Sequence, residues 1–118
     1  MGQREGGEHP NETRSIIAST TGGVLTEEVG AITGDLEVAT HLREAEGAEV
    51  SVRYVGTDEW YTVQGSPIKL GNAGDLSTTE LRGLHERMVR YLTTPGKIVE
   101  SNEQPTSLLR FSPTSGGG

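Results

Sequence analysis

Histidine is the first side chain to consider for chemistry, and His85 is the most suggestive of the three histidines in this sequence. It lies in a stretch of helical periodicity, on the side that carries apolar residues at three- and four-residue spacing: Leu81, Leu84, Met88 and Leu92. A histidine on such a face can act as a buried acid or base, or it can sit at the edge of the core, satisfied by one hydrogen bond. We favour the core-edge interpretation because no other catalytic residue type clusters near His85 in the sequence.

The remaining acidic, basic and nucleophilic residues do not match a catalytic or metal-binding motif. The three histidines are not spaced as metal ligands, and the chain has no cysteine. Carboxylates are adjacent at 27–28 and at 58–59, but adjacent side chains point in different directions. The loop GNAGD at 71–75 lacks the Lys and the following Ser or Thr of a phosphate-binding loop. The sequence therefore predicts no catalytic residue, no metal site and no cofactor, and we expect a protein that is not an enzyme.

Aromatic and basic side chains indicate a surface for a partner instead. Trp60 and Tyr61 are neighbours in a stretch of strand periodicity, so one can enter the core while the other is displayed. Aromatic residues beside cations are typical of the residues that dominate protein–protein binding. We expect the main partner-binding surface at Arg53, Trp60, Tyr61 and Lys69. A second expected surface is a basic stripe on the later helix, formed by Arg82, Arg87 and Arg90.

The length and the charge of the chain narrow the classes of function. With 118 residues the chain is long enough for one ordinary domain. Its net charge is −7, and it is unevenly distributed: residues 24–60 carry nine carboxylates against two arginines, whereas residues 61–99 carry three carboxylates against five cations. Such acidity disfavours non-specific binding to nucleic acid, which needs a concentrated positive surface.

The sequence also predicts where the protein resides. No apolar run approaches the ~18 residues of a membrane span, and the first residues contain no apolar stretch that could serve as a secretion signal. The absence of cysteine fits a reducing compartment. We therefore expect a cytoplasmic protein that does not associate with membranes.

The elements of the first half are weakly encoded. Residues 15–19 resemble a short strand, and residues 25–32 could form a turn or two of helix with Thr26 as its cap. Residues 35–46 fit a strand with Leu36, Val38 and Leu42 on one face. They also fit a helix that begins at Asp35 and ends before a glycine. We prefer the helix because alanine, glutamate, leucine and arginine favour it.

The elements of the second half are clearer. Alternating residues predict a hairpin over 49–64 with a break at 56–58, followed by a short edge strand at 67–70. Residues 77–93 predict the best helix of the chain, because Ser77 and Glu80 form a capping box ahead of the apolar periodicity. Short strands are expected at 97–100 and 107–111.

These elements predict an α+β fold, a small two-layer sandwich in which helices near 35–46 and 77–93 pack on an antiparallel sheet. Polar and glycine-rich composition assigns residues 1–14 to a disordered tail, 15–111 to the domain and 112–118 to a flexible glycine-rich tail. The function we expect is protein interaction or regulation without catalysis, through a protein partner or through self-association as a homodimer.

Two other functions stay open at this point. The arginine-lined helix could make the domain a nucleic-acid-binding module. A hairpin, a helix, later strands and a glycine-rich end are also the element order of ubiquitin-like β-grasp proteins, whose tail is adenylated and joined to an amine or a sulfur. That order implies a modifier or carrier that acts through its C-terminal glycines.

Overall fold

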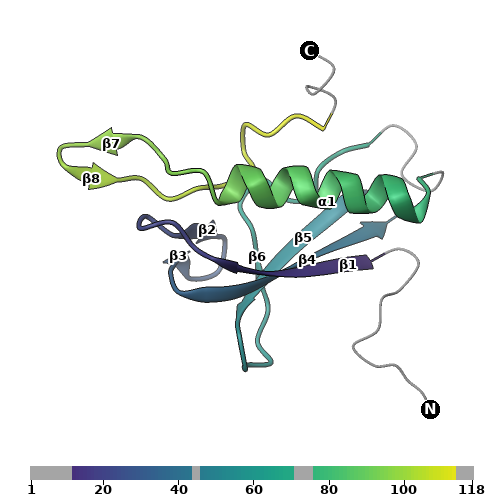
Figure 1. Cartoon of the computed structure of the whole chain (residues 1–118), viewed down its shortest axis with the longest axis horizontal. Coiled ribbons are helices and arrows are strands. Elements are labelled where there is room, and N and C mark those ends of the chain that lie inside the picture. The colour runs from purple at the N-terminus through teal and green to yellow at the C-terminus, as the bar shows by residue number, and fades with distance from the viewer. Residues whose placement is uncertain (1–11, 44–45, 71–75, 114–118) are drawn as a thin grey trace.

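The protein is a small α+β fold built on one four-stranded antiparallel sheet and one helix (Figure 1). The computed structural model describes residues 12–43, 46–70 and 76–113. The strands lie in the order β1-β4-β5-β6, which are Glu12–Ala18, Asp35–Arg43, Gly47–Tyr54 and Tyr61–Thr62. The helix α1, Thr78–Leu92, packs against β1 and β4 on one face of this sheet.

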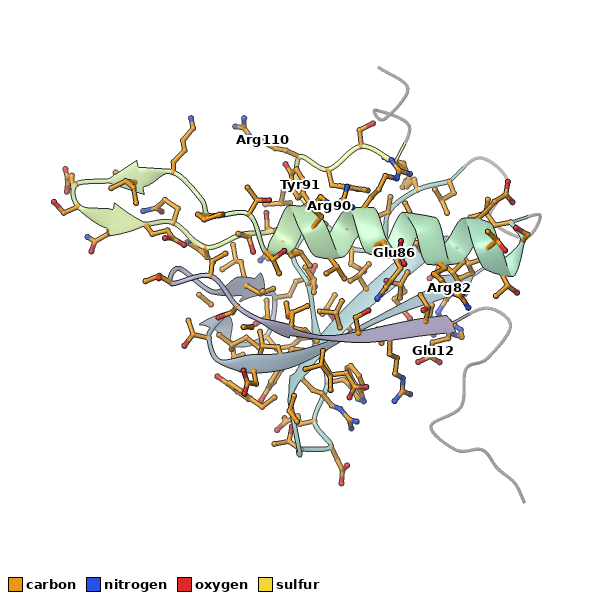
Figure 2. All side chains as sticks on the ribbon, in the orientation of Figure 1. Glu12, Arg82, Glu86, Arg90, Tyr91 and Arg110 are labelled. Carbon is orange, nitrogen blue, oxygen red and sulfur yellow. The ribbon has the colours of Figure 1, made fainter. Side chains whose placement is uncertain are left out.

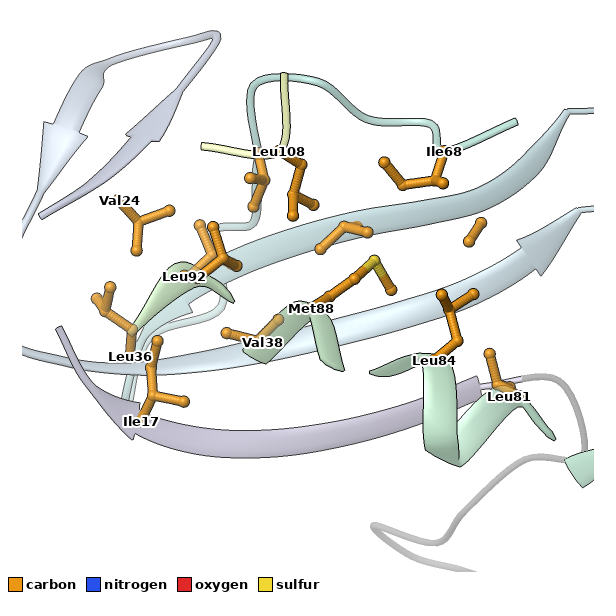
Figure 3. Close-up of a cluster of buried hydrophobic side chains, with 14 of the residues drawn as sticks. Ile17, Val24, Leu36, Val38, Ile68, Leu81, Leu84, Met88, Leu92 and Leu108 are labelled. Carbon is orange, nitrogen blue, oxygen red and sulfur yellow. The ribbon is translucent and has the colours of Figure 1, made fainter. Parts of the chain in front are cut away.

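The register of the sheet separates its two faces. Ser15 pairs with Val38 between β1 and β4, and Val38 pairs with Val52 between β4 and β5. Because side chains alternate along a strand, every second residue of β4 faces α1, and these residues are buried: Leu36, Val38, Thr40 and Leu42. Together with apolar residues of the helix they form the core in Figure 3, which includes Leu84, Met88 and Leu92.

The predicted helix at 35–46 is wrong, because residues 35–43 form β4. This strand is the second in the sheet and is paired on both sides, with β1 and with β5. Backbone pairing on both edges and burial of Leu36 and Val38 outweigh the weak helix propensity of the alanine and glutamate residues around them. The alternative strand pattern, with Leu36, Val38 and Leu42 on one face, is the one that the protein adopts.

The predicted short helix at 25–32 is also wrong. The segment forms two short strands, β2 (Val24–Thr26) and β3 (Gly30–Ile32), which pair with each other. Thr26 does use its side chain locally, but it closes a turn rather than capping a helix. Its hydroxyl donates to the carbonyl oxygen of Gly30 at 2.7 Å and accepts from the amide of Val29 at 3.1 Å. Gly30 has a φ of 77°, which a glycine adopts without strain.

The strands predicted between 49 and 70 are confirmed in part. β5 and β6 pair as an antiparallel hairpin, but only over Ser51–Thr62 and Val52–Tyr61, so β6 is much shorter than predicted. The expected edge strand at 67–70 is a single bridge in which Ile68 and Ala48 exchange two backbone hydrogen bonds of 2.7 and 2.8 Å.

The predicted helix at 77–93 is confirmed to within one residue at each end. The Ser77 hydroxyl accepts from the Glu80 amide at 3.0 Å, while the Glu80 carboxylate accepts from the Ser77 amide at 2.8 Å. This capping box satisfies two amides that the first helical turn cannot pair internally. Local residues alone encode this start, which explains why the sequence predicts it well.

The chain after the helix forms one hairpin and one irregular segment. β7 (Ile98–Val99) pairs with β8 (Asn102–Glu103), and this hairpin projects beyond the C-terminal end of α1 (Figure 1). The strand predicted at 107–111 is not present: Leu108 is buried in the core, and its amide donates to the carbonyl oxygen of Gln64 at 2.8 Å. β7 and β8 do not join the four-stranded sheet, so the topology gives no support to a β-grasp fold.

The two ends of the chain fall largely outside the described residues. β1 begins at Glu12, within the range 1–14 that composition assigns to a tail, while residues 1–11 are not described. At the other end Pro113 is described, and the terminal glycines at 116–118 are not. No helix in the described ranges is long and apolar enough to cross a membrane.

Candidate functional site

One face of the four-stranded sheet packs against α1, and the other face carries a cluster of charged side chains around Trp60. We call this second face the open face. It carries alternate residues of three strands: Glu12, Arg14 and Ile16 of β1, Glu37, Ala39 and His41 of β4, and Glu49, Ser51 and Arg53 of β5. Ile16 is 67% exposed although it is apolar, because its neighbours in β1 take the places that face the helix.

Two arginines approach Trp60 on the open face. The guanidinium carbon of Arg53 lies 4.6 Å from the centroid of the Trp60 ring, and that of Arg14 lies 5.3 Å from it. Both distances are within the range of cation–π attraction, which is strongest for tryptophan. Trp60 is half-buried in this position.

Glu37 holds both arginines near the tryptophan. One carboxylate oxygen accepts from Arg53 at 2.7 and 2.8 Å, and the other lies 4.0 Å from Arg14. The register explains this arrangement, because Glu37 is the cross-strand partner of Arg53 and Arg14 is on the adjacent edge strand. The Trp60 ring is therefore positioned by side chains from three different strands.

Next to Trp60 the open face contains a shallow hollow of about 280 Å³. The two smallest side chains around the hollow belong to Ala39 and Ser51, which are cross-strand partners. Trp60 and His41 are among the larger side chains that line it. Within the described ranges, the Ser51 hydroxyl and the Trp60 indole N–H make no hydrogen bond, so both can bond to a partner.

The open face carries both positive and negative side chains, and its arginines are paired with carboxylates. Besides the residues named above, Asp35 and Arg43 lie at the two ends of β4 on this face. Arg14 bonds to Glu12 at 2.8 Å, and Arg43 bonds to Glu49 at 3.1 Å. Such a surface fits a partner of mixed character better than a polyanion.

The structure places the four residues of the expected main surface in different positions. Arg53 and Trp60 come together on the open face. Tyr61 points to the other side of the sheet, where it is half-buried and packs against the margin of the core. Lys69 is exposed next to the Ile68 bridge, near the opposite end of β5 from Arg53.

The three arginines of the basic stripe on α1 also differ in their surroundings. Arg82 and Arg90 are exposed on the helix (Figure 2). Arg87 instead donates to the carbonyl oxygen of Pro113 at 2.7 Å and lies 5.9 Å from the centroid of the Phe111 ring. The Arg87 side chain thus fixes the C-terminal segment to the helix.

His85 is buried between the helix and the sheet, and only 1% of it is exposed. Its Nε2 lies 2.7 Å from the Ser15 hydroxyl, and its Nδ1 lies 2.8 Å from the Thr40 hydroxyl. Both ring nitrogens of His85 therefore take part in a hydrogen bond, whereas the sequence predicts a single hydrogen bond for this residue. Burial lowers the pKa of His85 from 6.5 to about 4, and the nearby Glu86 carboxylate opposes this shift only in part.

The Ser15–His85–Thr40 arrangement has the distances of a nucleophile and a base, but its electrostatics oppose that chemistry. A histidine base must carry a proton during the reaction, and burial disfavours the charged ring here. The third group is the neutral hydroxyl of Thr40, which cannot stabilise an imidazolium as a carboxylate does. The geometry therefore supports the interpretation of His85 as a residue at the edge of the core.

Sequence reasoning missed most of the open face. The sequence does not predict Arg14, Glu37, Ala39 or Ser51 as site residues. A signal was present in residues 35–43, where a strand places Glu37 and His41 on the face opposite Val38. The contribution of Arg14 could not be found this way, because it depends on β1 being the neighbour of β4.

No group of three or more histidine, cysteine or carboxylate side chains is placed to hold a metal ion in the part of the chain that the structure describes. Comparison with known proteins adds no family: no protein-family model, no curated protein and no solved structure matches the chain. The functional argument therefore rests on the geometry of the open face.

Proposed function

We propose that this protein is a non-enzymatic interaction domain that binds a protein partner through its open face. In this proposal the domain works as two layers: α1 and the buried side of the sheet provide the stable core, and the open side provides the binding surface. The observation that carries the proposal is that Arg14 and Arg53 converge on the chain's single tryptophan on that surface.

Tryptophan and arginine are the residues most often found to dominate protein–protein binding. Holding them in place before binding reduces the conformational entropy that is lost on association. The contacts of Glu37 with both arginines supply such an arrangement. The exposed Ile16 lies in the same cross-strand row as Glu37 and Arg53 and adds apolar surface.

The same face indicates the chemistry of the partner. The lining of the hollow beside Trp60 is mostly charged and polar, so a polar side chain of a partner can enter it and bond to the Ser51 hydroxyl. Since the arginines of the open face already have carboxylate partners, a polyanion gains little there. The nucleic-acid alternative rests instead on the arginines of α1, of which Arg87 is already bonded to the carbonyl oxygen of Pro113.

Site-specific photo-crosslinking tests the proposal. A photoreactive amino acid is placed at Ile16 or at Ser51 on the open face, and at Glu86 on the exposed side of α1 as a control. We expect the same protein to be captured at both open-face positions and not at Glu86. A second copy of the chain as the captured species would identify the partner as itself, which sedimentation would show as a dimer.

The captured protein is then purified and titrated while the fluorescence of Trp60 is followed. Trp60→Ala should weaken the affinity, measured with labelled partner, by about 30-fold or more, since truncating a dominant interface residue costs about 2 kcal/mol. Ile98→Ala, which removes an exposed apolar side chain from the projecting hairpin, should leave the affinity unchanged. An affinity that is the same for Trp60→Ala and the unmodified chain would contradict the proposal.

A further inference from the structure

A second cavity lies away from the sheet, between the C-terminal end of α1 and the chain that returns from β8. It has a volume of about 530 Å³, within the range of sites that bind ligands. Apolar side chains line much of it: Tyr91, Pro95, Pro105 and Leu109. Lys97 and Arg110 also line it, and Figure 2 shows Arg110 and Tyr91 close together above the last turns of α1. We call it the C-terminal cleft.

Contacts between its walls hold the C-terminal cleft open. The Thr106 hydroxyl donates to the carbonyl oxygen of Leu92 at 2.8 Å, which ties one wall to the end of the helix. The Gln104 amide donates to the carbonyl oxygen of Lys97 at 2.8 Å, which joins the two strands of the projecting hairpin at its base. Gly96 packs so closely on the carbonyl of Gln104 that a Cβ at this position would clash with it. The cleft therefore has its shape before a ligand binds.

The charges of the C-terminal cleft are of one sign. Lys97 and Arg110 are both exposed, no carboxylate lines the cleft, and neither cation takes part in an ion pair among the residues that the structure describes. The net charge of −7 does not cancel this local excess, because at physiological salt charges more than about 8 Å apart are largely screened. The cleft is thus an apolar surface with two available cations.

We propose that the C-terminal cleft binds a short acidic segment of a partner polypeptide. Carboxylates of the segment pair with Lys97 and Arg110, and an apolar side chain of the segment lies against Tyr91 and Leu109, which are 40% and 64% exposed. The two cations belong to two different chain segments, and Tyr91 and Leu109 line the same cleft. A peptide that carries several carboxylates and an apolar side chain can engage these groups together, whereas one small anion engages one cation at a time. The proposal does not depend on the open face.

The test uses the full chain, labelled with ¹⁵N, and a blocked hexapeptide that alternates Glu with Leu. Two matched peptides replace Glu by Lys or Leu by Ser, and octanoate serves as a small amphipathic anion. We expect the Glu–Leu peptide to shift the amide signals of Tyr91, Lys97 and Leu109 and the two matched peptides to leave them in place. The affinity should fall as salt is raised.

Variants assign the binding to the two cations. Arg110→Ala and Lys97→Ala should each weaken the Glu–Leu peptide by about fivefold, as expected for loss of one partly exposed charge pair. Arg82→Ala and Lys69→Ala remove an exposed cation of the same type elsewhere and should have no effect. All four positions are exposed, and circular dichroism checks that each variant is folded.

Three results would overturn the proposal. The first is no shift of the cleft signals at millimolar Glu–Leu peptide, or shifts confined to the open face. The second is equal binding of the Lys–Leu peptide, which would remove the role of charge. The third is octanoate binding as tightly as the peptide, which would assign the cleft to small anions instead of a polypeptide. If no partner binds the open face through Trp60, the peptide experiment on the C-terminal cleft is unaffected. The proposals for the open face and for the cleft can therefore fail separately.

Discussion

Acidification from pH 7 to pH 4 should destabilise this protein through His85. The ring is neutral in the folded state, because burial lowers its pKa from 6.5 to about 4. As the pH falls, the unfolded chain takes up a proton on this ring near pH 6.5, and the folded protein does so only near pH 4. The unfolded state is therefore favoured progressively across this window, and the stability contributed by the neutral ring is fully present only above it.

The size of the effect follows from the two pKa values. Linkage gives a loss of about 2 kcal/mol in the free energy of unfolding between pH 7 and pH 5, and about 3 kcal/mol by pH 4. These losses are a large part of the roughly 5–15 kcal/mol by which native proteins are stable. Because His85 is only 1% exposed, little solvent screening reduces them.

Urea unfolding at pH 7, 6, 5 and 4, followed by far-UV circular dichroism, measures this loss. His85→Gln keeps a side chain that can bond to Ser15 and Thr40 but cannot be protonated. We expect this variant to be less stable than the unmodified chain at pH 7 and to lose about 2 kcal/mol less between pH 7 and pH 5. Carboxylates titrate in both proteins, so the difference between them isolates His85.

The reasoning about His85 is refuted if the difference in unfolding free energy between His85→Gln and the unmodified chain is constant from pH 7 to pH 5. An NMR titration of the His85 ring in the unmodified chain gives an independent answer if the variant does not fold. A ring that gains its proton near pH 6.5 would show that burial does not disfavour the charged form of His85.

Two further predictions concern the core and the open face. Met88→Ala should lower the free energy of unfolding by about 2–5 kcal/mol in urea denaturation, because Met88 is fully buried and its truncation leaves a cavity; a loss below about 1 kcal/mol would contradict this packing. Glu37→Gln should release Arg14 and Arg53, lower the free energy of unfolding by about 1 kcal/mol and increase the quenching of Trp60 fluorescence by iodide. Glu46→Gln, at an exposed position, should change neither the stability nor the quenching. Equal quenching in both variants would show that Glu37 does not hold the arginines.

The helix at 77–93 and the strand at 35–43 show what the sequence can and cannot predict. The helix is encoded by residues that are neighbours along the chain: a capping box at its start and an apolar stripe along one face. Residues 35–43 carry patterns for both a helix and a strand, and no local signal decides between them. The choice is made by β1 and β5, which pair with the two edges of this segment. One misassigned element then hides the residues that β4 contributes to the open face.

The candidate site was predictable only where it is local. The sequence predicts Trp60 and Arg53 because an aromatic residue and a cation lie in one hairpin, and in the structure the Arg53 guanidinium carbon is 4.6 Å from the centroid of the Trp60 ring. Tyr61 follows Trp60 directly in the sequence, but alternation places the two side chains on opposite sides of the sheet, and Tyr61 packs against the core. Arg14 and Glu37 join Trp60 through the strand order and register, which no single segment encodes.

The open face and the C-terminal cleft should respond differently to salt, because their cations are in different states before binding. The arginines of the open face, Arg14, Arg43 and Arg53, are already paired with carboxylates. A partner of that face exchanges pairs that already exist, so its affinity should depend weakly on ionic strength. A ligand of the cleft forms new pairs with Lys97 and Arg110, so its affinity should fall clearly when salt is raised. Measuring both affinities at 50 and 500 mM salt separates the two surfaces, and equal salt dependence would refute the assignment of different charge states to them.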